Sequence, residues 1–134
     1  MTTDRRRALA DGLIAWLATG DRMDGLFAPD VFCDFSMPTW RLQAQGIEDV
    51  EALRKAGHPY RGEVPWHRLD STTNGFVLEF VETWTDAGDS WSSREILRAD
   101  IGDGGITNVT VYCTGDWDSA RRAEHADAVT LLRP

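Results

Sequence analysis

Residues 66–100 carry the stretch that decides the fold, WHRLDSTTNGFVLEFVETWTDAGDSWSSREILRAD. β-Branched and aromatic residues dominate three runs within it, and residues with turn chemistry separate these runs. Asn74-Gly75 between two such runs is a strong signal for a hairpin, and Asp86–Asp89 marks a second turn. A third, glycine-rich turn follows at residues 102–105. These signals predict an antiparallel meander of four strands, over residues 66–73, 76–85, 90–100 and 106–115.

Helical patterns precede and follow the meander. Apolar residues recur at helical spacing between Leu9 and Leu17, which predicts a first helix with Thr3 or Asp4 as its N-cap and Gly20 at its end. The other predicted elements are helices over residues 21–27, 46–56 and 119–126 and one early strand over residues 31–37. Helices grouped on one face of a curved antiparallel sheet make an α+β fold. Because linkers and repeats are absent, we expect one domain over residues 1–134.

The composition excludes several classes of protein. The chain has 134 residues and a formal net charge of −8, from 14 basic and 22 acidic residues, so it lacks the basic surface that binds nucleic acids or anionic membranes. Cys33 and Cys113 lack the spacing of a disulfide scaffold or a zinc site, and the three histidines form no metal-binding motif. No phosphate- or dinucleotide-binding glycine motif occurs. We therefore expect no cofactor and no metal and, since no targeting segment is recognisable, a cytoplasmic location.

Several features spread over nearly the whole chain occur together in one known superfamily. These are Gly20-Asp21, the residues 26–31 that enter the first strand (LFAPDV), the meander with its glycine turns, and the strand near residues 106–112. The chain thereby resembles the nuclear transport factor 2-like superfamily, and within it the SnoaL-like, polyketide cyclase-like branch. The resemblance implies a cone-shaped fold, in which a curved sheet wraps around the N-terminal helices and encloses a pocket. It also implies a homodimer formed through the exposed sheet face of Val77, Val81 and Ile96.

Alternate residues of a strand face opposite sides of a sheet, which assigns the side chains of the meander to two faces. If Asn74-Gly75 forms a two-residue turn, His67 pairs with Glu82, and the next hairpin pairs Phe80 with Glu95. His67, Glu82 and Glu95 then share one face with aromatic side chains. Opposite charges that compensate one another as a ladder gather on the other face, at Glu79, Arg94 and Arg98.

A histidine beside two carboxyl groups in apolar surroundings is suited to proton transfer, because burial and like charge raise the pKa of one carboxyl. We expect His67 to act as a general base that Glu82 orients, and Glu95 to act as an acid or oxyanion stabiliser. The resemblance to ketosteroid isomerases places Glu95 where these enzymes keep a protonated acid, but apolar residues replace their tyrosine and their base. A slip of the first hairpin by one residue would instead place Arg68 beside Glu82, which would then have a structural role.

Asp34 is a further catalytic candidate if a bulge in its strand turns it toward the pocket. Large apolar side chains that could line the pocket around a flat ligand are Trp16, Phe35, Trp40, Leu78, Phe80 and Trp84. Tyr112 joins them if Asp103-Gly104 forms a two-residue turn, whereas the family pattern favours Val111 and Cys113.

These features predict a cofactor-free acid–base enzyme of secondary metabolism, acting on an apolar metabolite that bears a carbonyl or an epoxide. The family's cyclases, isomerases, dehydratases and epoxide hydrolases perform such reactions. The alternative is a non-catalytic module of the same fold that binds a ligand or a partner. The polarity of the pocket distinguishes the two, because a pocket without a titrating group near the ligand favours binding alone.

Overall fold

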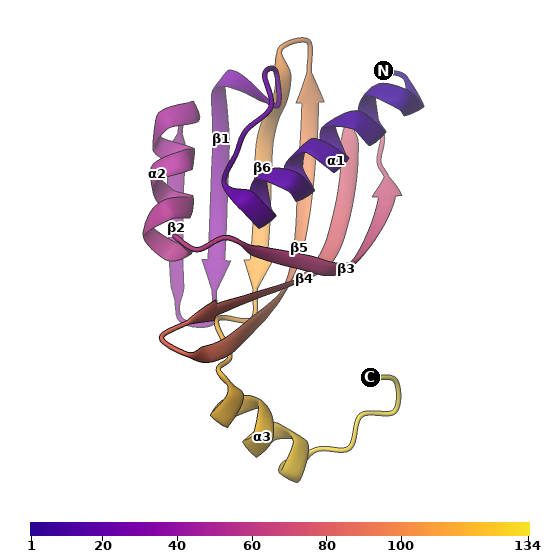
Figure 1. The fold of residues 1–134 in the computed structure, drawn as a ribbon. Helices are drawn as coiled ribbons and strands as arrows, with labels where there is room; N and C mark the ends of the chain where they lie inside the picture. Colours follow the sequence, from indigo (N-terminus) through magenta and orange to yellow (C-terminus); the bar gives the residue numbers. More distant parts are fainter.

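The structure, a computed structural model, describes residues 1–134 as one six-stranded sheet with three helices (Figure 1). The strands lie in the order β2-β1-β6-β5-β4-β3, and neighbours are antiparallel except for β1 and β6. Their bounds are β1 Phe27–Met37, β2 Trp40–Gln45, β3 Gly62–Ser71, β4 Gly75–Asp86, β5 Asp89–Gly102 and β6 Gly105–Cys113. The arrangement confirms the predicted α+β class and the antiparallel meander, which is β3–β6.

Helix α1 (Thr3–Thr19) lies diagonally across one face of the sheet (Figure 1). Its N-cap is Thr2 and not Thr3 or Asp4 as predicted, because the Thr2 hydroxyl accepts a hydrogen bond from the backbone N–H of Arg5. It ends where predicted, at Gly20, whose positive φ of 78° lets its N–H donate to the carbonyl of Trp16. Its apolar stripe is buried against the sheet and comprises Leu9, Ala10, Leu13, Trp16 and Leu17.

The other two helices occupy different ends of the molecule. Helix α2 (Ile47–Gly57) packs against β1 and β2, near the predicted range. Helix α3 (Ser119–Ala128) begins after Asp118, whose carboxylate accepts from the backbone N–H of Arg121, and it lies beyond the end of the sheet (Figure 1). No helix in the chain has the length and apolarity that a membrane span requires.

The N-terminal half differs from the prediction in two places. The short helix over residues 21–27 does not form: Gly25 adopts a positive φ of 78° in a turn, and β1 begins at Phe27. A seven-residue segment interrupted by glycine provides too few hydrogen bonds to offset helix nucleation. The strand β2 was not predicted, although Trp40, Leu42 and Ala44 alternate with polar residues; it is a short edge strand that leaves most of its side chains exposed.

The registers of the meander are partly as predicted. The β4–β5 hairpin pairs Phe80 with Glu95 and Trp84 with Trp91, which confirms the prediction. The β3–β4 hairpin pairs His67 with Phe80, so the predicted pairing of His67 with Glu82 was wrong by two residues. The reason is that Gly75 belongs to β4, with Thr72 closing the turn through hydrogen bonds to the backbone of Gly75. A shift of two residues leaves each side chain on its predicted face.

The division of the sheet into two faces is confirmed by burial. Side chains of the inner face are buried, as at Phe76, Leu78, Phe80, Glu82 and Leu97. Side chains of the outer face of β5 are exposed, as at Arg94, Ile96 and Arg98. The expected ladder on this outer face is absent, because Glu79, Arg94 and Arg98 take part in none of the ion pairs.

Candidate active site

A cavity of about 280 Å³ lies between α1, α2 and the inner face of the sheet. Seventeen of its 24 lining residues are hydrophobic, so its walls suit an apolar ligand. The thiols Cys33 and Cys113 are among these seventeen, and the other lining residues are Arg54, Gly57, His58, Glu82, Ser93, Glu95 and Asp116. An apolar cavity with a few convergent polar groups is the arrangement expected of a small-molecule site.

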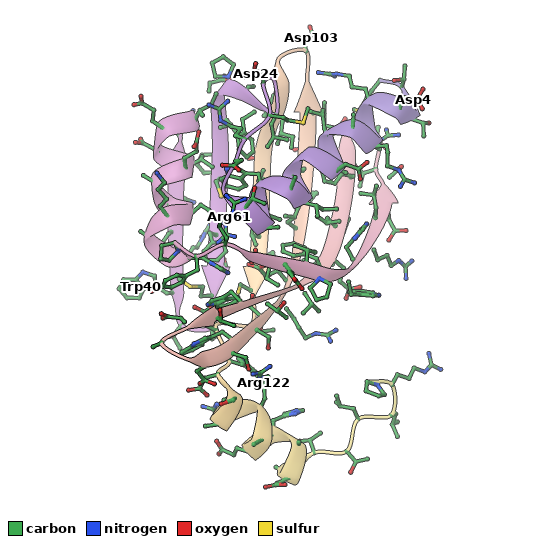
Figure 2. All side chains as sticks on the ribbon, in the orientation of Figure 1. Asp4, Asp24, Trp40, Arg61, Asp103 and Arg122 are labelled. Carbon is green, nitrogen blue, oxygen red and sulfur yellow. The ribbon has the colours of Figure 1, made fainter.

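Four of the predicted lining residues border this cavity, namely Trp16, Phe35, Trp40 and Phe80. Trp40 is 64% exposed and lies at the periphery, next to the turn between β1 and β2 (Figure 2). Leu78 and Trp84 are buried in the core and do not border the cavity, so these two predictions were wrong. Tyr112 is also misplaced by the prediction: it is 61% exposed on the outer face, and its neighbours Val111 and Cys113 line the cavity.

Two of the four predicted catalytic residues meet in the cavity. Glu82 and Glu95 both line it, and they are 4% and 8% exposed. His67 is exposed on the edge strand β3 and does not line the cavity. Asp34 faces outward, where Arg41 binds its two carboxylate oxygens at 2.9 and 2.6 Å. The bulge in β1 lies before Phe32, too early to turn Asp34 inward.

Arg54, which the sequence analysis assigned no role in the site, connects three parts of it. The guanidinium comes from the last turns of α2 and donates from Nη2 to Glu82 Oε1 at 2.9 Å. The same nitrogen donates to the carbonyl of Leu17 at the end of α1, and Nη1 donates to the carbonyl of His58 at 3.2 Å. Spacing contained a signal for this position, because Arg54 follows the buried Val50 by four residues and so lies on the inner face of α2.

Glu95 is the least compensated group of the site. Burial raises the pKa of the Glu95 carboxyl well above its ordinary value, and the neighbouring Glu82 carboxylate raises it further. Its Oε2 atom is buried and has no hydrogen-bond partner in the protein. Asp116, which also lines the cavity, has a pKa raised by burial and then by Glu82. Glu95 therefore retains its proton to a higher pH than an ordinary glutamate and offers a free oxygen to a ligand.

His58 supplies the imidazole that the sequence analysis sought at His67. It follows α2 directly, and its ring centroid lies 4.0 Å from that of Trp84. Burial lowers the pKa of His58, and the nearby charge of Arg54 lowers it further. Its Nδ1 atom is buried without a partner. A half-buried imidazole that stays neutral is a suitable proton acceptor. Composition could not distinguish this histidine from the other two.

The thiols of the cavity are poor nucleophiles. Burial raises the pKa of Cys33 to about 11 and that of Cys113 to about 12, and the reactive thiolate is correspondingly rare at neutral pH. No group of three or more His, Cys, Asp or Glu side chains is arranged to hold a metal ion. Among the lining residues, the groups suited to proton transfer are Glu95, whose pKa is raised, and His58, whose pKa is lowered.

Comparisons with known proteins bear on the fold. No protein-family model and no curated protein matches the chain. Among solved structures, a nuclear transport factor 2-like protein from Anabaena variabilis superposes with a TM-score of 0.67 at 19% identity, covering 87% of this chain and 96% of its own. Two candidate polyketide cyclases are also similar. The protein from Pseudomonas putida has a TM-score of 0.64 at 19% identity, covering 89% of this chain and 96% of its own. The protein from Xanthomonas campestris has a TM-score of 0.63 at 22% identity, covering 81% and 90%. The chain therefore has the nuclear transport factor 2-like fold.

Proposed function

We propose that the protein is a cofactor-free acid–base enzyme that acts on a small apolar metabolite bearing a carbonyl group. The observation that carries this proposal is Glu95, a buried carboxyl with a raised pKa and an unpartnered oxygen on an apolar cavity. The similarity in fold to candidate polyketide cyclases supports a role of the SnoaL-like type in secondary metabolism. Two free cysteines are compatible with the reducing cytoplasm, where we place the protein.

Each polar group has a distinct task in the proposed reaction. The protonated Glu95 donates a hydrogen bond to the substrate carbonyl and stabilises the negative charge that develops on its oxygen. His58 accepts a proton from the carbon next to that carbonyl, which produces an enol or enolate for cyclisation, isomerisation or elimination. The Arg54–Glu82 ion pair keeps a carboxylate beside Glu95, which helps to retain the Glu95 proton. An epoxide oxygen would accept from the same acid.

The alternative is a binding module without catalysis. The cavity polarity favours an enzyme, because an acid and a base with shifted pKa values border the space that a ligand would occupy. Buried groups of this kind destabilise a fold and are unnecessary for holding an apolar molecule.

Proton exchange tests the proposal without knowledge of the natural substrate. In D₂O, the protein should accelerate the exchange of the α-protons of 2-acetylnaphthalene, an apolar aromatic ketone, followed by NMR. The variants His58→Ala and Glu95→Gln should each lower this acceleration by about a hundredfold or more. The matched control is His67→Ala, which removes an exposed histidine outside the cavity and should leave exchange unchanged. A ketone that binds without any accelerated exchange would contradict catalysis and favour the binding module.

We also propose a homodimer formed through the outer face of the sheet. Ile96 and Tyr112 are 44% and 61% exposed there, beside Val81. On the same face, the carboxylate of Glu79 and the guanidinium of Arg94 form no ion pair within the chain, so a second copy can satisfy both in a symmetric contact. Light scattering should give twice the mass of the chain, and Ile96→Glu should give a monomer. A monomeric wild-type protein would refute this contact.

A further inference from the structure

We propose that Glu82 determines the charge selectivity of the cavity: by neutralising Arg54, it makes the site bind uncharged ligands in preference to carboxylates. This inference rests on the proposed function, since it specifies the substrate class of the same cavity. It concerns binding alone, however, and is tested without any measurement of turnover.

The positive charge of the cavity comes from one side chain. Arg54 is the one Lys or Arg side chain among the cavity lining, and it is the group to which a carboxylate ligand would bind. Its terminal nitrogens already donate to the carbonyls of Leu17 and His58 and to Glu82. Nε is its one nitrogen that is buried without a partner. The Nε–H is sufficient for a carbonyl oxygen, but the paired hydrogen bonds of an arginine–carboxylate contact cannot form there, because Nη2 already donates both of its N–H bonds.

Acidic groups outnumber basic groups around the cavity. Three carboxyl groups border the cavity, at Glu82, Glu95 and Asp116, against one guanidinium. Glu82 lies in an ion pair with Arg54, with side chains that are 5% and 14% exposed, so the two charges cancel where water is scarce. A carboxylate ligand would enter next to Glu82 and Asp116 with no free cation to compensate it. Loss of its hydration then opposes binding.

The unpartnered polar atoms of the cavity indicate which ligand group would satisfy them. Arg54 Nε–H is a donor, the protonated Glu95 offers Oε2, and His58 offers Nδ1, and none of the three has a partner in the protein. Glu95 is more than nine-tenths buried on the cavity, which makes it a built part of the site rather than a surface acid. An uncharged carbonyl oxygen satisfies the two donors, while the aromatic and aliphatic walls contact the rest of the molecule.

Three probes that share a naphthalene ring test the inference. They are 2-acetylnaphthalene, which is neutral, 2-naphthoate, which is anionic, and 2-naphthylmethylammonium, which is cationic. Calorimetric titration of the wild-type protein at neutral pH should show that the ketone binds about tenfold or more tightly than naphthoate. In Glu82→Gln, Arg54 is no longer neutralised, so the affinity for naphthoate should rise about tenfold or more while that for the ketone changes little.

Two further variants keep the test decisive. Asp116→Asn removes a carboxyl that makes no ion pair, so it can be measured even if Glu82→Gln does not fold. It should raise the affinity for naphthoate in the same direction, by a smaller factor. The control is Glu63→Gln, which makes the same chemical change at an exposed position of β3 outside the cavity and should alter no affinity.

Three results would overturn the inference. In the first, the wild-type protein binds naphthoate as tightly as the ketone. In the second, neither Glu82→Gln nor Asp116→Asn changes the affinity for naphthoate. In the third, the ammonium probe binds most tightly of the three. The last result would mean that the carboxyl groups recognise a cation. None of these depends on proton exchange: exchange of the ketone without discrimination against naphthoate refutes only the charge selectivity. Discrimination without exchange refutes only the catalysis.

Discussion

Arg54 and Glu82 form a buried ion pair that joins the end of α2 to the centre of β4, with 2.9 Å between Nη2 and Oε1. Water is largely excluded from both side chains, which are 14% and 5% exposed. The pair thus serves two purposes. It attaches the second helix to the sheet, and it places one compensated carboxylate beside Glu95 in the cavity.

Removing one partner of this pair should destabilise the fold. Arg54→Met leaves Glu82 charged and buried and also removes donors from the carbonyls of Leu17 and His58, so we expect a loss of about 3–5 kcal/mol in the free energy of unfolding. Urea titration followed by circular dichroism measures the free energy of unfolding of the variant and of the wild type. The control is Arg41→Met, which breaks the exposed ion pair with Asp34 and should cause a much smaller loss. Equal losses in the two variants would contradict the role of burial.

The raised pKa of Glu95 makes stability depend on pH. The folded protein binds this proton more tightly than the unfolded chain, because burial first and Glu82 second raise the pKa above 4.5. The stability that Glu95 contributes is therefore fully present below the ordinary pKa and is lost as the pH rises through the pKa of the folded state. Glu95→Gln cannot ionise, so its free energy of unfolding should fall less than that of the wild type between about pH 5 and pH 8.

Urea midpoints at several pH values compare the two proteins. Asp116, whose pKa is shifted in the same direction, and His58, whose pKa is lowered, titrate in both proteins, so the difference isolates Glu95. Parallel pH profiles of wild type and variant would show that Glu95 ionises normally in the fold.

Gly75 should not tolerate a side chain, although its backbone is not in the left-handed region. A Cβ atom at this position would collide with the carbonyl oxygen of Ala99 in the neighbouring strand. Gly75→Ala should therefore lower the stability by about 1–3 kcal/mol, as overpacking does elsewhere. The matched control is Gly57→Ala at the end of α2, where a Cβ meets nothing within 4 Å. Thermal unfolding of both variants decides the matter, and an unchanged midpoint for Gly75→Ala would contradict the close approach of β4 and β5.

The two free thiols should be protected in the folded state. The pKa values of about 11 for Cys33 and about 12 for Cys113 leave little thiolate near neutral pH, and burial restricts access. Ellman's reagent should react with both thiols much more slowly in the native protein than in urea. A native reaction as fast as that of the unfolded chain would show that Cys113 is open to solvent.

Local patterns in the sequence predicted the meander and its two faces. Alternation along β4 and β5 placed Glu82 and Glu95 inside and Arg94 and Ile96 outside, because the period of a strand is a property of adjacent residues. The same logic failed for the pairing of His67, since the Asn-Gly signal names a turn but does not say whether Gly75 belongs to the turn or to the strand. In the structure Gly75 belongs to the strand: it exchanges hydrogen bonds with Thr72, and it lies close to the backbone of Ala99 in β5.

The sequence by itself determined α1, the meander, the two faces of the sheet and two of the three carboxyl groups of the cavity, Glu82 and Glu95. Only the tertiary structure decided which groups accompany them. Arg54 and His58 reach Glu82 and Trp84 because α2 packs over β1 and β2, at the far edge of the sheet from β3, where His67 lies. Periodicity reports which way a side chain faces within its own element, whereas the meeting of two elements depends on how the whole sheet curves and packs.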